Sequence, residues 1–257
     1  MNKQALLHVT TCAVLCACAM TNVANADPMA TDRPDFVESS TTVGAGRWQI
    51  EMGLVRERGA EGESTSWLLP ALLRVGLGDS WELRFESDTF QRVRLPDGET
   101  FDGLNDLAVG LKYHVQAEPL GASLAWLVHA DLDTGSAEFR GTGVRPSLRL
   151  VAEWALNDDW SLGVMPGVVR DHDGEGRYTA WIASAVIGRA LSDHHRVFAE
   201  IQLPQIAATE HGGTQAAFDV GGAWLLSDDL QLDTAISLGL NERTPDWAWT
   251  LGLSIRW

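Results

Sequence analysis

The chain has 257 residues, a formal net charge of −16 and 45% hydrophobic residues. The acidic balance argues against nucleic acid as a partner, because phosphate binding needs a surplus of Lys and Arg. After the N-terminal leader no run approaches the roughly 18 apolar residues of a helical span, which leaves alternating strands as the means of crossing a bilayer at this average hydropathy.

The first 26 residues have the features of a secretory signal peptide. Lys3 is their single charged residue, residues 5–20 are mostly apolar, and Ala24-Asn25-Ala26 forms a small-x-small cleavage site. All cysteines of the chain lie here, so we expect neither disulfides nor thiol chemistry in the mature protein: Cys12, Cys16 and Cys18. Residues 15–18 loosely match a lipobox, which makes a lipoprotein signal the alternative.

Residues 27–46 carry no strand pattern. They hold the charged sequence Thr31-Asp32-Arg33-Pro34-Asp35-Phe36 and then a run rich in Ser, Thr and Gly. We expect an N-terminal extension, lying in the periplasm or inside a lumen, followed by a barrel domain over residues 47–257.

From residue 47 onward the sequence is a series of segments with period-two alternation. In the final segment the odd positions from Trp247 to Trp257 are large and apolar, and the even positions are small or polar, so one strand face is apolar. We predict twelve strands, centred on residues 48–54, 67–77, 81–86, 106–115, 123–132, 144–153, 160–169, 177–189, 197–203, 218–224, 230–238 and 247–257. An even number suits a closed antiparallel up-and-down barrel.

The connections between these segments fall into two alternating classes. One set is short: residues 78–80, 117–121, 156–159, 191–195 and 227–229. The other set is mostly longer and more charged: residues 57–64, 94–103, 134–143, 170–176, 204–214 and 241–246. Short periplasmic turns that alternate with longer external loops are typical of outer-membrane barrels.

The tryptophans indicate the same architecture. The chain has 11, and most are placed near predicted strand ends. We assign an inner girdle of Trp48, Trp81, Trp154, Trp160, Trp224 and Trp257, and an outer girdle of Trp67, Trp247 and Trp249. Aromatic rings at both membrane interfaces are expected of a transmembrane barrel, whereas a soluble sandwich would bury only one or two such rings.

If the apolar face meets lipid, the opposite face lines the lumen. The candidate pore-lining residues are Glu82, Arg84, Glu86, Asp106, Lys112, His114, His129, Asp131, Arg145, Arg149, Glu153, Glu200, Asp219, Asp233 and Arg256. Both signs of charge occur, so these groups either fill a narrow barrel with ion pairs or line a polar pore that selects solutes. Substituting Arg145 or Arg149 distinguishes the two hypotheses. In a pore the substitution changes conductance or selectivity, whereas in a filled barrel it changes stability alone.

No catalytic or metal site is expected. A lipid hydrolase needs a Ser–His–acid set at the outer surface, and no Gly-x-Ser-x-Gly occurs. The pair His194-His195 falls in a short turn without a second ligand pair. Residues 171–175 resemble a calcium loop, but Ile182 stands where an EF-hand has its bidentate glutamate. We therefore predict no enzyme activity, no metal and no cofactor.

Several segments together resemble a family of Gram-negative outer-membrane transporters named after the MetA pathway of phenol degradation. They are Thr31-Asp32-Arg33-Pro34-Asp35-Phe36, residues 43–51, 72–77, 81–84, 103–107, 110–113, 134–136, 219–221, 230–233 and 239–241. The resemblance implies a barrel that moves small compounds, aromatic or hydrophobic ones among them. It implies no particular catalytic or binding residues.

The leading hypothesis is thus a passive channel for small molecules in the cell outer membrane. Its expected partners are the small-molecule solute, outer-membrane lipids with lipopolysaccharide, and the barrel-assembly machinery. The alternatives are a closed structural or adhesive barrel that acts through its outer loops and, less favoured, a membrane hydrolase.

Overall fold

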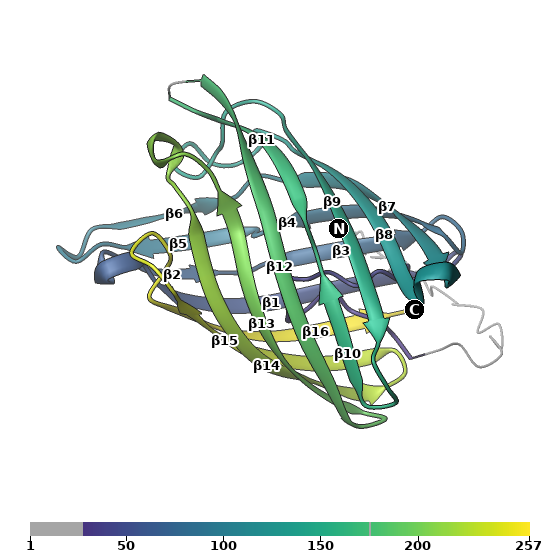
Figure 1. Cartoon of the computed structure of the whole chain (residues 1–257). Helices are drawn as coiled ribbons and strands as arrows, with labels where there is room; N and C mark the ends of the chain where they lie inside the picture. The colour runs from purple at the N-terminus through teal and green to yellow at the C-terminus, as the bar shows by residue number, and fades with distance from the viewer. Residues whose placement is uncertain (1–27, 175) are drawn as a thin grey trace, which may run out of the picture.

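A computed structural model of the chain describes residues 28–174 and 176–257, so the predicted signal peptide lies outside the described residues. The described part is one antiparallel sheet closed on itself (Figure 1). Its strands are β1 (Trp48–Arg58), β2 (Thr65–Leu68), β3 (Ala71–Gly76), β4 (Trp81–Ser87), β5 (Phe90–Arg94), β6 (Thr100–Leu104), β7 (Ala108–Ala117), β8 (Ala122–Asp131), β9 (Arg145–Ala155), β10 (Trp160–Val164), β11 (Gly167–Asp173), β12 (Gly176–Ser192), β13 (His195–Ile206), β14 (Gln215–Ser227), β15 (Leu230–Gly239) and β16 (Trp247–Arg256).

These segments form the twelve strands of a closed barrel, as predicted. Four barrel strands are each broken once, into β2–β3, β4–β5, β6–β7 and β10–β11. Pro70 causes the first break, because it has no N–H to donate, although its carbonyl still accepts a bond of 2.9 Å from the Gly53 N–H. The barrel closes where β16 pairs with β1, from Gln49 opposite Arg256 to Arg58 opposite Trp247.

The two ends of the barrel differ, as the connection lengths indicated. One end, the short-turn end, carries the tight connections, among them the short 3-10 helix Glu118–Leu120. The other, the long-loop end, carries the longer connections and two further 3-10 helices, Ala60–Gly62 and Thr209–His211. The prediction of a loop over residues 94–103 is wrong, because Phe90–Arg94 pairs with Thr100–Leu104 and continues the sheet as a hairpin beyond the barrel wall. The hairpin was not predicted because both of its faces lie outside the apolar belt, so its strands are rich in polar residues.

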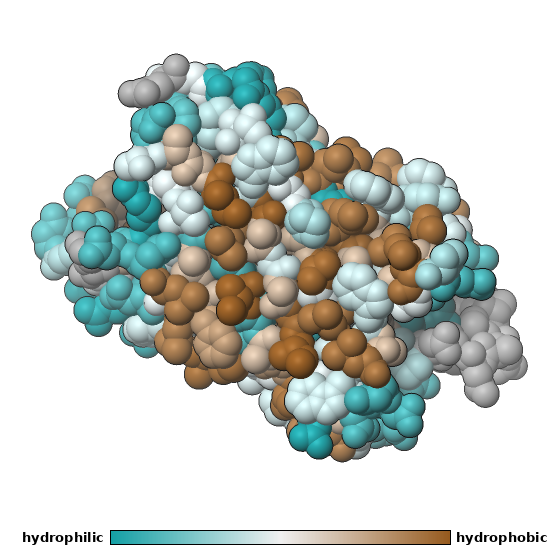
Figure 2. All heavy atoms as spheres, in the orientation of Figure 1, coloured by the Kyte–Doolittle hydropathy of each residue, from teal (hydrophilic) through white to brown (hydrophobic). Residues whose placement is uncertain are grey.

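The outer surface carries an apolar belt. Figure 2 shows apolar side chains gathered over the middle of the strands and polar ones toward the ends. Large apolar side chains that a soluble protein would bury are open to the outside, including Val128, Ile201, Val220, Ile236 and Leu251. On the inward face of the barrel strands, Glu82, Lys112, Glu200 and Asp233 are buried. This inversion of the usual burial pattern is that of a barrel whose outer face meets lipid. Among the described residues, no helix is long and apolar enough to cross a membrane.

The last residue contributes to barrel closure. Trp48 and Trp257 exchange two backbone hydrogen bonds, of 3.0 and 2.9 Å, and the Trp257 ring is 61% exposed on the outer face. We predict that deleting Trp257 lowers the amount of folded barrel in the outer membrane several-fold, because an unpaired strand edge then faces lipid. Heat-modifiable gel mobility of membrane fractions measures this. Trp181→Leu, which removes an equally exposed ring without touching the seam, is the control and should stay near wild-type level.

Candidate functional site

Residues 28–47, here called the N-terminal segment, lie inside the barrel. The segment enters at the short-turn end, where the Met29 N–H donates to the Asp228 carbonyl at 2.8 Å. It then runs into the lumen and returns to the same end, where Gly46 donates to the Gly76 carbonyl at 3.1 Å. Position 76 has room only for glycine, because a Cβ there would lie 1.7 Å from the Gly44 carbonyl oxygen. The site is therefore the lumen together with the segment that occupies it.

Arg74 is the centre of one half of the network. Its guanidinium donates to Glu82 at 2.8 Å and to Glu51 at 3.0 Å, and it is fully buried. It also donates to the carbonyls of Ala30 and Thr41, at 2.9 and 2.8 Å, and so ties both limbs of the segment to the wall. Five donors in a fixed fork allow one arginine to satisfy several acceptors at once.

Asp32 links the segment to the next strands. Its carboxylate accepts from Arg84 at 2.6 Å and from Lys112 at 3.1 Å. Arg84 also pairs with Glu38 at 2.8 Å and donates to His129 at 3.1 Å. Burial raises the pKa of Asp32, but the nearby cations Arg74, Lys112 and Arg84 outweigh it and hold the pKa well below the usual range. Asp32 is therefore ionised under all physiological conditions.

The opposite wall holds the segment in a different way. Glu200 accepts the backbone N–H groups of Phe36 and Val37 at 2.7 and 2.8 Å, so a carboxylate caps otherwise unpaired donors. Val37 also joins an apolar cluster inside the lumen, with Phe36 packed against it; the cluster residues on the wall are Ala125, Leu127, Val151, Met165, Ile182, Val186, Phe198 and Ala235. Sequence reasoning missed this cluster, because it treated the inward face as uniformly polar.

The structure brings most of the predicted lumen residues onto the N-terminal segment. Those in direct hydrogen-bond or ion-pair contact with it are Glu82, Arg84, Lys112, His114, Arg149, Glu153, Glu200 and Asp233. Others bond to the wall or to loops, namely His129, Asp219, Arg256, and Arg145 with Asp106. Glu86 and Asp131 line a cavity of about 430 Å³ near the long-loop end.

Several residues of the network were not among the sequence candidates. They are Arg74 and Arg196 on the wall, and Asp32, Arg33, Asp35 and Glu38 on the segment. The available signal was charge density, because residues 31–38 place four charges in eight positions. The inward orientation of Arg74 follows from the alternation of β3.

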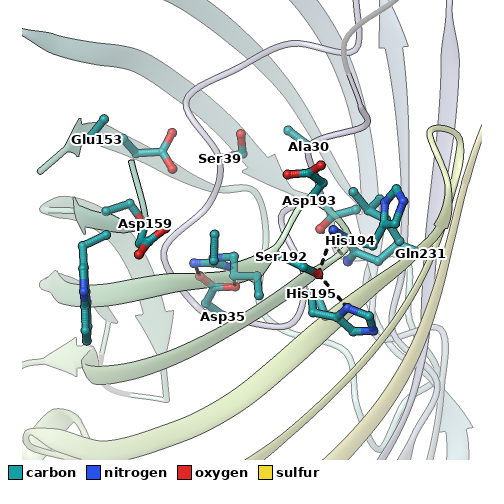
Figure 3. A pocket seen from close by; sticks show the side chains of 18 of the residues that line it. Ala30, Asp35, Ser39, Glu153, Asp159, Ser192, Asp193, His194, His195 and Gln231 are labelled. Atoms are coloured by element: carbon teal, nitrogen blue, oxygen red, sulfur yellow. Dashed lines mark hydrogen bonds and ion pairs between the residues drawn. The ribbon is translucent and has the colours of Figure 1, made fainter. Parts of the chain in front are cut away.

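Two cavities lie on either side of the segment. The short-turn cavity, about 390 Å³, is lined by Asp35, Glu153, Asp159, His195 and Arg196 among others, and Figure 3 shows side chains from the segment and the wall around this hollow. The long-loop cavity, about 360 Å³, is lined by Asp35, Phe36, Gln202 and Trp249 among others. Asp35 lines both cavities. Its carboxylate binds Arg196 through two contacts, of 3.0 and 2.5 Å, and this pair stands between them.

The Glu38 carboxylate gives the network a pH dependence. Burial raises its pKa, but Arg84 and Arg149 lower it more, to about 2. Because this pKa is depressed in the folded state, Glu38 contributes stability above its unfolded pKa of about 4.3 and loses it as the pH falls toward 2.

We predict that Glu38→Gln lowers the unfolding free energy by about 3 kcal/mol at pH 7. Denaturant titration in micelles should show a constant difference from wild type between pH 8 and 5, which shrinks below about pH 4. A difference that already shrinks between pH 7 and 5 would contradict the assignment.

The sequence of the chain matches a known protein family over nearly its whole length. Residues 31–257 match the family model described as "Putative MetA-pathway of phenol degradation". The chain belongs to this family. The match begins at Thr31, so the family pattern includes the part of the N-terminal segment that carries Asp32, Arg33 and Asp35. A search of curated proteins finds no match.

Solved structures share the fold of this family member. The COG4313 outer membrane channel from Pseudomonas putida F1 is similar with a TM-score of 0.64 and 14% identity, over 87% of this chain and 99% of that one. The KdgM porin gives a TM-score of 0.55 and 11% identity, over 80% of this chain and 98% of that one. The NanC porin gives a TM-score of 0.55 and 11% identity, over 81% of this chain and 98% of that one. The chain thus has the same closed β-barrel fold as these outer-membrane proteins. Among its described residues no group of three or more His, Cys, Asp or Glu is arranged to hold a metal ion.

Proposed function

We propose that this family member is an outer-membrane channel for passive passage of small molecules, in which the N-terminal segment narrows the lumen. The observation that carries the proposal is the pair of cavities that meet at Asp35, one open toward each end of the barrel. Each holds about 360–390 Å³, which suits a small solute and excludes a folded protein or a long polymer.

The segment is expected to stay in place while solute passes. Leaving the lumen would take Asp32 away from Arg84 and Lys112, and Glu38 away from Arg84. Buried cations that lose carboxylate partners are strongly unfavourable. The contact between Asp35 and Arg196 is the weaker point, because the Arg196 side chain is 37% exposed and reaches solvent. We infer that solute passes beside the segment, where this ion pair opens.

The class of solute follows from the two ends of that path. The long-loop cavity offers Pro34, Phe36 and Pro204, so an aromatic or apolar body can lie there. The short-turn cavity offers charged and hydroxyl groups from Asp159, Ser192 and His195. A small compound with an apolar body and a polar group suits both. This agrees with a family named after phenol degradation.

A closed structural barrel is the second candidate function, since the ion network fills much of the lumen. The two are separated by planar-bilayer recording of the purified barrel, combined with swelling of liposomes in small neutral solutes. A channel gives discrete conductance steps and swelling, which the heat-unfolded protein does not. A folded barrel that passes neither ions nor solutes would remove the channel proposal and favour the structural one.

A further inference from the structure

Three arginines lie together on the outer face of the barrel at the long-loop end. Adjacent strands place Arg56 of β1 opposite Trp67 of β2, and Trp67 opposite Arg92 of β5. Arg94 follows two residues later on the same face of β5. The Arg56 guanidinium carbon lies 5.4 Å from the centre of the Trp67 ring. We call Arg56, Arg92, Arg94 and Trp67 the arginine patch.

The patch borders the apolar belt. Arg56 shares its strand face with Met52 and Leu54, which belong to the lipid-facing series of β1. Trp67 is 39% exposed, as expected of a ring at a membrane interface. The patch therefore stands at the level of the lipid headgroups, on the side of the long loops, which is the outer leaflet.

The charges of the patch are poorly compensated by the protein. Among the described residues, no carboxylate lies within 4.0 Å of the guanidinium of Arg56 or Arg94, and Arg92 has one exposed pair with Asp102 at 3.6 Å. In a chain of net charge −16, three arginines around a hollow of about 620 Å³ form a local positive site. Guanidinium forks match the oxygens of a phosphate in two-point contacts.

We propose that the arginine patch binds the phosphate groups of a phosphorylated lipid of the outer leaflet, whose acyl chains lie along the apolar belt below it. A lipid fits better than a free anion because the apolar surface continues directly from the patch. Arg56 and Arg92 flank the Trp67 ring, so one phosphate can rest between them while Arg94 reaches a second. This inference is independent of whether the barrel conducts.

Native mass spectrometry of the purified barrel, titrated with diphosphorylated lipid A, tests the proposal. We expect binding, with the dephosphorylated lipid bound at least about tenfold more weakly, since one charge-assisted hydrogen bond has that magnitude. Inorganic phosphate in excess should not displace the lipid. Displacement by phosphate would assign the site to free anions, and equal binding of the dephosphorylated lipid would overturn the proposal.

Variants locate the site. Arg56→Gln and Arg92→Gln should each weaken lipid A binding by about tenfold. The matched control is Arg189→Gln, because Arg189 also stacks on an outward-facing tryptophan, Trp160, at 5.2 Å but lies at the short-turn end. It should bind like wild type. Heat-modifiable gel mobility confirms that each variant is folded, and unchanged binding by folded Arg56→Gln and Arg92→Gln would contradict the assignment.

Discussion

Arg74→Ala is expected to lower the unfolding free energy by about 3–5 kcal/mol, which is the usual cost of removing one partner from a buried ion pair. The substitution leaves Glu51 and Glu82, both fully buried, without their main cation. It also removes the donor for the carbonyls of Ala30 and Thr41, so the N-terminal segment loses two anchors at once. Denaturant unfolding in detergent micelles, followed by tryptophan fluorescence, measures the loss.

Two further variants make this result interpretable. Arg140→Ala removes an exposed arginine of a long loop and should change the unfolding free energy by no more than about 0.5 kcal/mol. Arg74→Lys keeps the positive charge but not the forked guanidinium, so it should lose less unfolding free energy than Arg74→Ala. If the alanine variant does not fold, the lysine variant still provides the measurement. A loss as small as that of Arg140→Ala would show that the buried network does not hold the segment.

The second large effect is expected at Asp35. Asp35→Ala should raise single-channel conductance several-fold, because it removes the carboxylate that holds Arg196 across the junction of the two cavities. Arg196→Ala should act in the same direction and should also weaken any preference for anions, since it removes the cation that pairs with Asp35 beside the short-turn cavity. Planar-bilayer recording measures conductance, and reversal potentials under a salt gradient measure selectivity.

The matched control for Asp35 is Asp193→Ala. Asp193 lines the same short-turn cavity and carries the same charge, but it lies in the turn between β12 and β13. Its removal should leave conductance near wild type. Equal effects of Asp35→Ala and Asp193→Ala would indicate that general cavity charge, and not the Asp35–Arg196 pair, controls passage.

The barrel itself could be predicted because its rules are local. Alternation decides which residues of a strand such as β16 face lipid, and connection lengths decide which end is which. The hairpin of β5 and β6 escaped prediction for the same reason. It lies beyond the apolar belt, so its outward face carries Arg92, Arg94 and Asp102 and not a row of apolar side chains.

The interior could be predicted only in part. The inward orientation of residues such as Lys112 and Asp233 follows from alternation. Their partners, however, lie far away in sequence, 80 residues in the Lys112–Asp32 pair and 200 in the Asp233–Arg33 pair. The position of residues 28–47 depends on these long-range pairs and on the fit of Val37 into the apolar cluster. No local pattern encodes either, so the choice between periplasm and lumen could not be made from the sequence.

The most direct test of passage beside a stationary segment is a reversible cross-link. The Ser40 and Ser123 hydroxyl oxygens lie 2.6 Å apart, one on the segment and one on β8, and residues 27–257 contain no cysteine. In Ser40→Cys/Ser123→Cys, the oxidised barrel should show the same bilayer conductance before and after reductant is added, because the segment need not leave the lumen. Conductance that appears only after reduction would contradict this account and would make the segment a gate that must move away.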